Sequence, residues 1–356
     1  MPAPTRRTTP PAPATGRVGI KDVARHAGVS VGTVSNVINN PEMVSEETRL
    51  RVRTVIEQLG YVRSEFARQL RAGRSRLVGM LVLDLANPFF AEVAKGAERT
   101  LRDADLGVMV CNSAGSTTEE TEYLSLFAEQ RIRGVLVTPA DSSGRTVEAL
   151  RAKGIPFVLV DRSLPAEEGC SVSVDDVRGG TMATAHLLNA GHRHLAFVGG
   201  PTRLPQVRDR LGGARTAVAD AGLQPDALVH ITSDHLDVAS GRDAGARLLG
   251  LASRPTAVFC ANDLMALGVL QALYGAGVRV PDDIAMVGYD DIEFAAAAAV
   301  PLTSVRQPAA LIGRTAAELL LEETSDDADG HRHRRIVLQP ELVVRESSNT
   351  RVPRTG

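Results

Sequence analysis

Short, mostly apolar runs alternate with stretches of helical periodicity over residues 78–287, and this alternation restricts the fold more than any other feature of the sequence. The runs lie at residues 78–83, 108–110, 134–137, 157–160, 194–198, 256–260 and 284–287. Such runs are typical of strands buried on both faces of a parallel sheet. Because they fall into two sets, the pattern predicts two similar α/β lobes with a cleft between them.

Polar residues follow several of these runs directly, at the ends of the predicted strands. They are Asn87, Asn112, Ser113, Asp161, Arg162, Asn262, Asp263, Asp290 and Asp291. Any one of them is more often a helix cap or a loop residue than a ligand contact. Ligands of parallel sheets nevertheless bind beyond the carboxyl ends of the strands, so the full set predicts a binding cleft.

The N-terminal segment is basic, unlike the rest of the chain. Residues 17–76 contain eleven Lys and Arg against six Asp and Glu, a balance of +5, whereas the whole chain of 356 residues has a formal net charge of −2. This asymmetry indicates an anionic partner for the segment alone, although a solvated charged surface explains the charge equally well.

Helical spacing within the basic segment predicts two helices joined by a tight turn. Four residues of the first helix fall at i, i+3, i+4 and i+7, namely Ile20, Val23, Ala24 and Ala27. Gly28 is placed to end this helix, and Ser30 can cap the next one. The inward face of the second helix comprises Val31 or Val34, together with Val37 and Ile38. This is a helix-turn-helix pattern, and Ser45 begins a third helix.

The outward face of the second helix carries candidate DNA contacts. Its early outward residues are Gly32, Thr33, Ser35 and Asn36. In a recognition helix such residues reach base edges in the major groove, and asparagine can form a bidentate contact with adenine. The alternative is that they are surface polar residues of a small helical bundle.

The sequence IKDVARHAGVSVGTVSNVINNPEMVSEETRLRVRTVIEQLGY closely resembles the headpiece of the lactose-repressor (LacI/GalR) family. The resemblance implies that the second helix enters the major groove. It places Val31, Gly32 and Asn36 where the operator bases are chosen, and Thr33 and Ser35 where backbone or bases are contacted.

A hinge segment is expected after Tyr61, although residues 62–64 depart from the family's usual Pro-Asn pair. Residues 66–70 resemble the family's hinge helix, which folds on DNA. The resemblance implies DNA contacts for Ala67 and Leu70, with Leu70 wedged into the minor groove at the operator centre. Such a wedge unstacks a base step and bends the duplex.

From about residue 77 to residue 349 the chain resembles the same family, through the sequences NPFF, VDR, AND and GYDD and an Arg210-x-x-Gly213 element. The resemblance implies the two-lobed fold of periplasmic sugar-binding proteins, with three crossings between lobes. The implied effector-binding residues are Asn87, Phe89, Phe90, Asp161, Arg162, Arg210, Asn262 and Asp290. An apolar wall with a few placed polar groups suits a hydroxyl-rich ligand.

The predicted organisation is a disordered tail (1–17), an all-α helix-turn-helix headpiece (18–62), a hinge helix and linker (63–76) and a two-lobed α/β effector-binding and dimerisation domain with parallel sheets (77–350). We expect neither a cofactor nor a metal. His331 and His333, like His192 and His194, lie at i, i+2 among arginines, and a solvated loop is the default interpretation.

The expected function is a cytoplasmic transcriptional repressor that binds a palindromic operator as a homodimer and responds to a small molecule, a sugar or sugar derivative first and a purine-like base second. A solute-binding transport protein is the alternative, but it has no use for a helix-turn-helix. No phosphate-binding loop, nucleophile elbow or dinucleotide fingerprint indicates an enzyme. The sequence contains neither a secretory leader nor an apolar stretch long enough to span a membrane, and its three cysteines are far apart.

Overall fold

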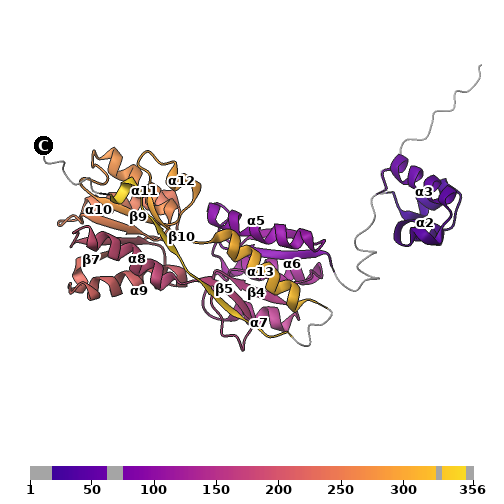
Figure 1. The fold of residues 1–356 in the computed structure, drawn as a ribbon, viewed down its shortest axis with the longest axis horizontal. Coiled ribbons are helices and arrows are strands. Elements are labelled where there is room, and N and C mark those ends of the chain that lie inside the picture. Colours follow the sequence, from indigo (N-terminus) through magenta and orange to yellow (C-terminus); the bar gives the residue numbers. More distant parts are fainter. Residues whose placement is uncertain (1–17, 62–74, 326–330, 350–356) are drawn as a thin grey trace, which may run out of the picture. The chain divides into compact units, whose positions relative to one another are not determined.

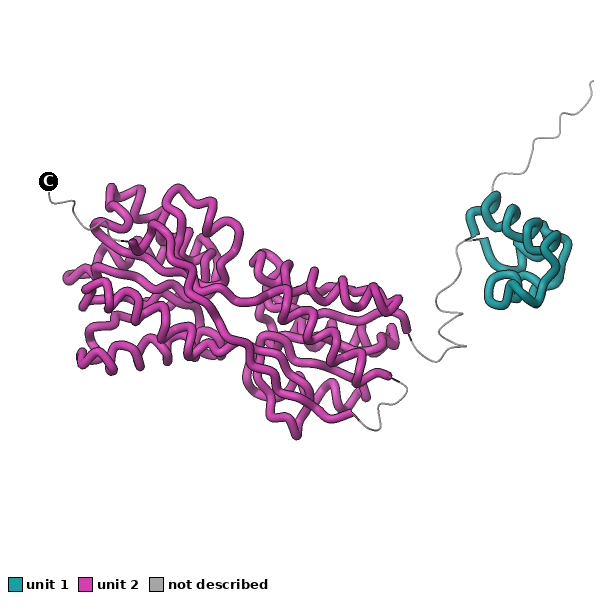
Figure 2. The backbone as a smooth tube through the Cα atoms, viewed as in Figure 1, with its two compact units in different colours: residues 1–73 teal, residues 74–356 magenta. Residues whose placement is uncertain are grey.

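The structure is a computed structural model that describes residues 18–61, 75–325 and 331–349. The chain divides into two compact units, Met1–Gly73 and Arg74–Gly356 (Figure 2). The predicted tail and most of the predicted hinge, including Ala67 and Leu70, lie outside the described residues. Within the described ranges no helix is long and apolar enough to cross a membrane.

The small unit is built from helices: α1 (Ile20–Ala27), α2 (Val31–Asn39), the 3₁₀ turn η1 (Pro41–Met43) and α3 (Glu46–Leu59). Its core consists of Val23, Ala24, Ala27, Val34, Val37 and Val52. Gly28 ends α1 at a φ of 65°, the left-handed conformation that glycine adopts without strain, and so makes the sharp turn into α2 possible. Of the two alternatives for the inward face of α2, Val34 packs in the core and Val31 is 41% exposed.

The first lobe of the large unit contains most of the early elements. They are β1 (Leu77–Val82), α5 (Pro88–Asp103), β2 (Gly107–Asn112), α6 (Thr117–Glu129), β3 (Val135–Val137), α7 (Arg145–Ala152), β4 (Phe157–Val160) and β5 (Cys170–Val174). Two elements from late in the chain complete it, α13 (Ala309–Glu323), which lies beside α5, and β11 (Arg335–Leu338) (Figure 1). The described strands form one parallel sheet in the order β11-β5-β4-β3-β1-β2.

The second lobe repeats the same scheme. Its elements are α8 (Asp176–Asn189), β6 (Leu195–Gly199), α9 (Pro205–Asp220), η2 (Pro225–Ala227), β7 (Leu228–Thr232), α10 (Val238–Leu249), β8 (Ala257–Cys260), α11 (Asp263–Gly275), β9 (Ala285–Asp290), α12 (Glu293–Ala296), β10 (Thr303–Arg306), β12 (Glu341–Val343) and η4 (Glu346–Ser348). The strand order is β12-β10-β9-β8-β6-β7, and β12 pairs antiparallel with β10. The expected α/β fold with two parallel sheets is thereby confirmed.

The chain crosses between the lobes after β5, after β10 and between β11 and β12, as Figure 1 shows. Each lobe's helices pack closely where glycines allow it. A Cβ added at Gly180 of α8 would lie 2.0 Å from the carbonyl oxygen of Arg210, and one added at Gly213 of α9 would lie 2.0 Å from that of Val177. Glycine at these positions fixes the distance between α8 and α9, and with it the position of Arg210.

Candidate functional site

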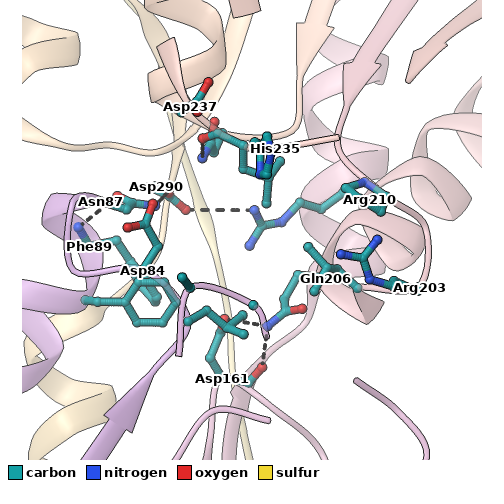
Figure 3. Close-up of a pocket in the computed structure, with 18 of the residues that line it drawn as sticks. Asp84, Asn87, Phe89, Asp161, Arg203, Gln206, Arg210, His235, Asp237 and Asp290 are labelled. Atoms are coloured by element: carbon teal, nitrogen blue, oxygen red, sulfur yellow. Dashed lines mark hydrogen bonds and ion pairs between the residues drawn. The ribbon is translucent and has the colours of Figure 1, made fainter. Parts of the chain in front are cut away.

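A pocket of about 300 Å³ lies between the two lobes of the large unit (Figure 3). The first lobe contributes residues that follow β1, β2 and β4, and the second contributes residues that follow β6, β7, β8 and β9. Seven of the eight predicted effector-binding residues line it: Asn87, Phe89, Phe90, Asp161, Arg210, Asn262 and Asp290. They meet because the carboxyl ends of parallel strands share one edge of each sheet.

An apolar wall forms one part of the pocket. Asn87 caps α5 by accepting a hydrogen bond of 3.0 Å from the amide of Phe89, and Pro88 is suited to the first helical turn. The cap fixes Phe89 and Phe90, whose rings meet edge to face with centroids 5.1 Å apart. Apolar side chains of Leu83, Leu204 and Leu236 also line the pocket.

Asp290 accepts two hydrogen bonds at the end of β9. Asn87 Nδ2 lies 2.9 Å from its Oδ2 and Gln307 Nε2 lies 2.7 Å from its Oδ1. Burial raises the pKa of Asp290 above its usual range, although Arg210, Asn87 and Gln307 oppose the shift. The bond from Asn87 joins the first lobe to the second.

Asp161 forms a second contact between the lobes. It follows β4 with a φ of 55°, and its Oδ2 accepts a hydrogen bond of 2.9 Å from Gln206 Nε2 of α9 (Figure 3). Burial raises the pKa of Asp161 to about 7, and the nearby Asp176 carboxylate adds to the shift. Asp161 Oδ1 and Gln307 Oε1 are both buried, and neither has a hydrogen-bond partner within the described part of the chain.

Arg210 is the buried cation of the pocket. Its Nε donates to Asp176 Oδ1 at 2.8 Å, its Nη1 donates to the carbonyl of Ala261 at 2.8 Å, and its guanidinium carbon lies 3.7 Å from the centre of the Tyr289 ring. Burial lowers the pKa of Arg210, but the surrounding carboxylates, Asp176 first, raise it by a larger amount, so the net shift of the pKa is upward. Arg210 is therefore a fixed positive charge.

Other residues at the strand ends have roles within the protein. Arg162 does not line the pocket, because its guanidinium turns away and donates to the carbonyl of Asp141 at 3.0 Å. Asp263 accepts bonds from Ser304 Oγ at 2.7 Å and from the Ile292 amide at 2.9 Å. Asp291 pairs with Arg306 and Arg345.

Several lining residues were not predicted. They are Asp84, Arg203, Gln206, His235, Asp237 and Gln307, among others. Gln206 lies four residues before Arg210 on α9, so helical periodicity could have found it. Gln307 directly follows β10, whose sequence TSVR is not an apolar run, so the sequence pattern does not indicate a strand end there.

The predicted DNA-contacting residues of the small unit lie on α2. Ser30 caps this helix by accepting a hydrogen bond of 3.0 Å from the amide of Thr33. Val31 and Gly32 are exposed in its first turn, and Thr33, Ser35 and Asn36 are half-buried. The side chain of Ser35 is already engaged, because its Oγ accepts a hydrogen bond of 3.1 Å from Asn39 Nδ2.

Comparison with known proteins gives matches over both units. Residues 19–64 match the family described as bacterial regulatory proteins, lacI family, and residues 184–348 match the periplasmic binding protein-like domain. The HTH-type transcriptional repressor PurR of Photobacterium profundum is 37% identical over 329 residues, which is 92% of this chain and 98% of that protein.

Solved structures of transcriptional regulators also match this chain over both units. The transcriptional regulator CelR in complex with cellobiose has 34% sequence identity and a TM-score of 0.71, and the match covers 93% of this chain and all 100% of that one. The lac repressor dimer bound to operator and the anti-inducer ONPF has 27% identity and a TM-score of 0.79, over 94% of this chain and 99% of that one. The first of these structures contains a small ligand, and the second contains both operator DNA and a small ligand.

Proposed function

Because the chain belongs to the LacI family of bacterial regulatory proteins, we propose that it represses transcription by binding operator DNA through α2 and that a small effector in the interlobe pocket controls this binding. It is a DNA-binding transcriptional regulator and not an enzyme. The lac repressor dimer on its operator supports a homodimer that reads a palindromic site, and a repressor of this kind acts in the cytoplasm, where its DNA lies.

The exposed first turn of α2 supports its assignment as the recognition helix. Val31 is 41% exposed although it is a large apolar residue, and Gly32 beside it leaves the helix surface without a side chain. An apolar residue can contact a thymine methyl group, and Asn36 can bind adenine. Thr33 and Ser35 would contact backbone or bases, and Ala67 and Leu70, outside the described residues, keep the roles that the family resemblance implies.

The observation that carries the effector proposal is the pair of unpartnered acceptors on the pocket's polar side. Asp161 Oδ1 and Gln307 Oε1 are buried without hydrogen-bond partners in the described structure, and Asp84, Asp234 and Asp237 add further carboxylates. Acceptors of this kind favour a ligand that offers several hydrogen-bond donors, and hydroxyl groups supply them. Phe89 offers a flat apolar face for a sugar ring. A sugar or sugar derivative is therefore the first candidate.

A purine-like base is the second candidate, and the similarity to PurR favours it. A planar base would stack on Phe89, but it carries fewer donors than a sugar and would leave more of the carboxylates unpaired. Burying an unpaired polar group costs about 1–3 kcal/mol, so the acceptor-rich pocket favours the hydroxyl-rich ligand.

Hydrogen bonds within two pairs of residues from opposite lobes provide a means of coupling. Asn87–Asp290 and Gln206–Asp161 both join the lobes at the pocket, so a ligand that competes with or reinforces them changes the balance between lobe arrangements. Because coupling is reciprocal, operator DNA must change effector affinity by the same factor as effector changes operator affinity.

The proposal is tested with the full-length chain by selecting binding sites from random duplexes at fixed ionic strength, with and without cellobiose, ribose, hypoxanthine and guanine. We expect enrichment of a palindromic site and a change of operator affinity with one class of ligand. A chain that shows no preference for any duplex over random competitor contradicts the DNA assignment. A response to the bases alone would replace the sugar assignment by the purine one.

A further inference from the structure

Four residues with metal-binding side chains meet in the first lobe, away from the interlobe pocket. Cys170 is the first residue of β5 and Glu323 is the last residue of α13, whereas His331 and His333 precede β11. Because β5 and β11 pair in parallel, with Arg335 opposite Ser171, the two histidines lie beside Cys170 at the amino end of both strands. The pocket residue Asp161 follows the carboxyl end of β4 in the same sheet.

The distances in this cluster suit a small metal ion. Cys170 Sγ lies 3.2 Å from His331 Nε2 and 3.8 Å from His333 Nδ1. With Zn–S bonds of about 2.3 Å and Zn–N bonds of about 2.0–2.1 Å, neighbouring ligand atoms of a tetrahedral site are roughly 3.3–3.6 Å apart. All four ligand atoms lie within 4.8 Å of one another, so a small inward movement of the ligands would complete the tetrahedron.

The surroundings of the ligands also fit a metal site. His331 presents Nε2 to the cysteine, while its Nδ1 lies 3.7 Å from Glu322 Oε2, the carboxylate–histidine arrangement that orients a metal-binding imidazole. The backbone amide of Arg334 donates to Cys170 Sγ at 3.4 Å, as amides do toward a thiolate ligand. Glu323 Oε2 is buried and has no hydrogen-bond partner within the described residues, which leaves it available to a cation.

We propose that Cys170, Glu323, His331 and His333 form a closed tetrahedral site for a borderline divalent transition-metal ion, with Zn²⁺ as the best match. One thiolate and two imidazoles exclude the hard cations Mg²⁺ and Ca²⁺, which prefer oxygen ligands. Four protein ligands leave no open position, so the ion is structural rather than catalytic. It ties the end of α13 to the entry of β5 and β11.

This site escapes sequence analysis because its members are far apart in the chain. His331 and His333 lie at i, i+2 among arginines, which alone favours a solvated loop. Only the pairing of β5 with β11 brings Cys170 to them, and only the end of α13 brings Glu323.

The test uses full-length, tag-free protein that has been stripped with a chelator and then titrated with Zn²⁺ against a chromophoric competitor. We expect close to one Zn²⁺ per chain and a rise in the thermal midpoint. Co²⁺ should give a thiolate-to-metal charge-transfer band, which reports cysteine ligation directly. His333→Ala is at an exposed position, where we expect the fold to be unchanged, and it should weaken Zn²⁺ binding at least tenfold. Cys170→Ser should abolish the charge-transfer band.

Matched controls are Cys111→Ser, which removes a half-buried thiol from β2 of the same sheet, and His192→Ala with His194→Ala, which removes the other i, i+2 histidine pair. Both should bind Zn²⁺ as the unmodified chain does. Glu322→Gln should weaken binding by about 10–100-fold through the orientation of His331. The proposal is overturned if the stripped, folded chain binds no Zn²⁺, if His333→Ala binds with unchanged affinity, or if the controls lose binding equally.

Discussion

Asn87 Nδ2 donates a hydrogen bond of 2.9 Å to Oδ2 of Asp290, a residue 203 positions later in the chain. This bond joins the first lobe to the second. The same asparagine caps α5 through its Oδ1. One side chain therefore fixes both the helix that carries Phe89 and the contact between the lobes. A ligand that enters the pocket meets a preformed connection.

Asn87→Ser separates these two roles, because serine can still cap α5 but is too short to reach Asp290. We expect the free energy of unfolding to fall by about 1.5–3 kcal/mol, the typical contribution of a hydrogen bond to a charged group. Asn87→Ala should lose roughly 1 kcal/mol more, since it also removes the cap. Urea denaturation measures both. Equal stability of Asn87→Ser and the unmodified chain would show that the interlobe bond contributes nothing.

Arg210→Met tests the buried ion pair with Asp176. Removing the guanidinium leaves Asp176 buried without its main partner, so we expect a loss of about 3–5 kcal/mol in urea denaturation. Arg210→Met combined with Asp176→Asn removes both charges and should recover part of this loss. If the double variant is no more stable than Arg210→Met, the uncompensated charge is not the cause.

Asp161 should make stability depend on pH near neutrality. Burial raises its pKa from 3.8 to about 7 in the folded protein, so between these values the folded chain binds more protons than the unfolded chain. Stability contributed by this group is present below about pH 4 and is lost as pH rises through about 7. Asp161→Asn cannot ionise, so its stability relative to the unmodified chain should increase from pH 5 to pH 8.

Asp141→Asn is the matched control for this pH dependence. Burial raises the pKa of Asp141, but hydrogen bonds from Ser143 and Arg145 together with the Arg145 charge outweigh it and lower the pKa to about 2, so Asp141 stays ionised throughout that range. The stability difference between Asp141→Asn and the unmodified chain should therefore stay constant from pH 5 to pH 8. A constant difference for Asp161→Asn as well would contradict the raised pKa of Asp161.

Much of the pocket could be predicted because strand ends in a parallel sheet share an edge. Asn87, Asp161, Asn262 and Asp290 each follow a buried apolar run, and all four line the pocket. Arg162 follows the same apolar run as Asp161, but neighbouring residues point in different directions after a strand. Position after a run therefore does not indicate which of the two side chains faces the pocket. The choice depends on the positive φ of Asp161 and the carbonyl of Asp141.

The strands that sequence analysis missed are β5, β7, β10, β11 and β12, each of which contains polar or charged residues that interrupt an apolar run. β5 reads CSVSV, yet all of it is buried, because Ser171 bonds within the lobe to the backbone of Leu164. β11 and β12 lie far along the chain from the sheets that they join. Their membership depends on the two late crossings between lobes, which local periodicity does not encode.

Asn36→Ala tests the recognition helix. If Asn36 makes a bidentate base contact, the substitution should relax base preference at one operator position by about 1–3 kcal/mol and leave the salt dependence of binding unchanged. Asn189→Ala, at an exposed position on α8 of the large unit, is the matched control and should bind all operator variants as before. Binding measured by anisotropy across single-base operator variants decides the matter. An unchanged base preference would show that Asn36 does not contact an operator base.

Gly213→Ala tests whether the close contact between α8 and α9 positions Arg210. The added Cβ would lie 2.0 Å from the carbonyl oxygen of Val177. Because this oxygen belongs to the backbone of α8, the clash can be relieved only if one of the two helices moves. We expect a loss of about 1–3 kcal/mol in urea denaturation, together with weaker effector binding as Arg210 shifts. Gly212→Ala, one residue earlier on α9, meets nothing within 4 Å and should instead stabilise the helix by up to about 1 kcal/mol. Both variants replace glycine by alanine within α9, so they change helix propensity equally. A difference in stability between them therefore reports the contact with α8. Equal effects of the two substitutions would mean that the spacing of these helices does not depend on the glycine.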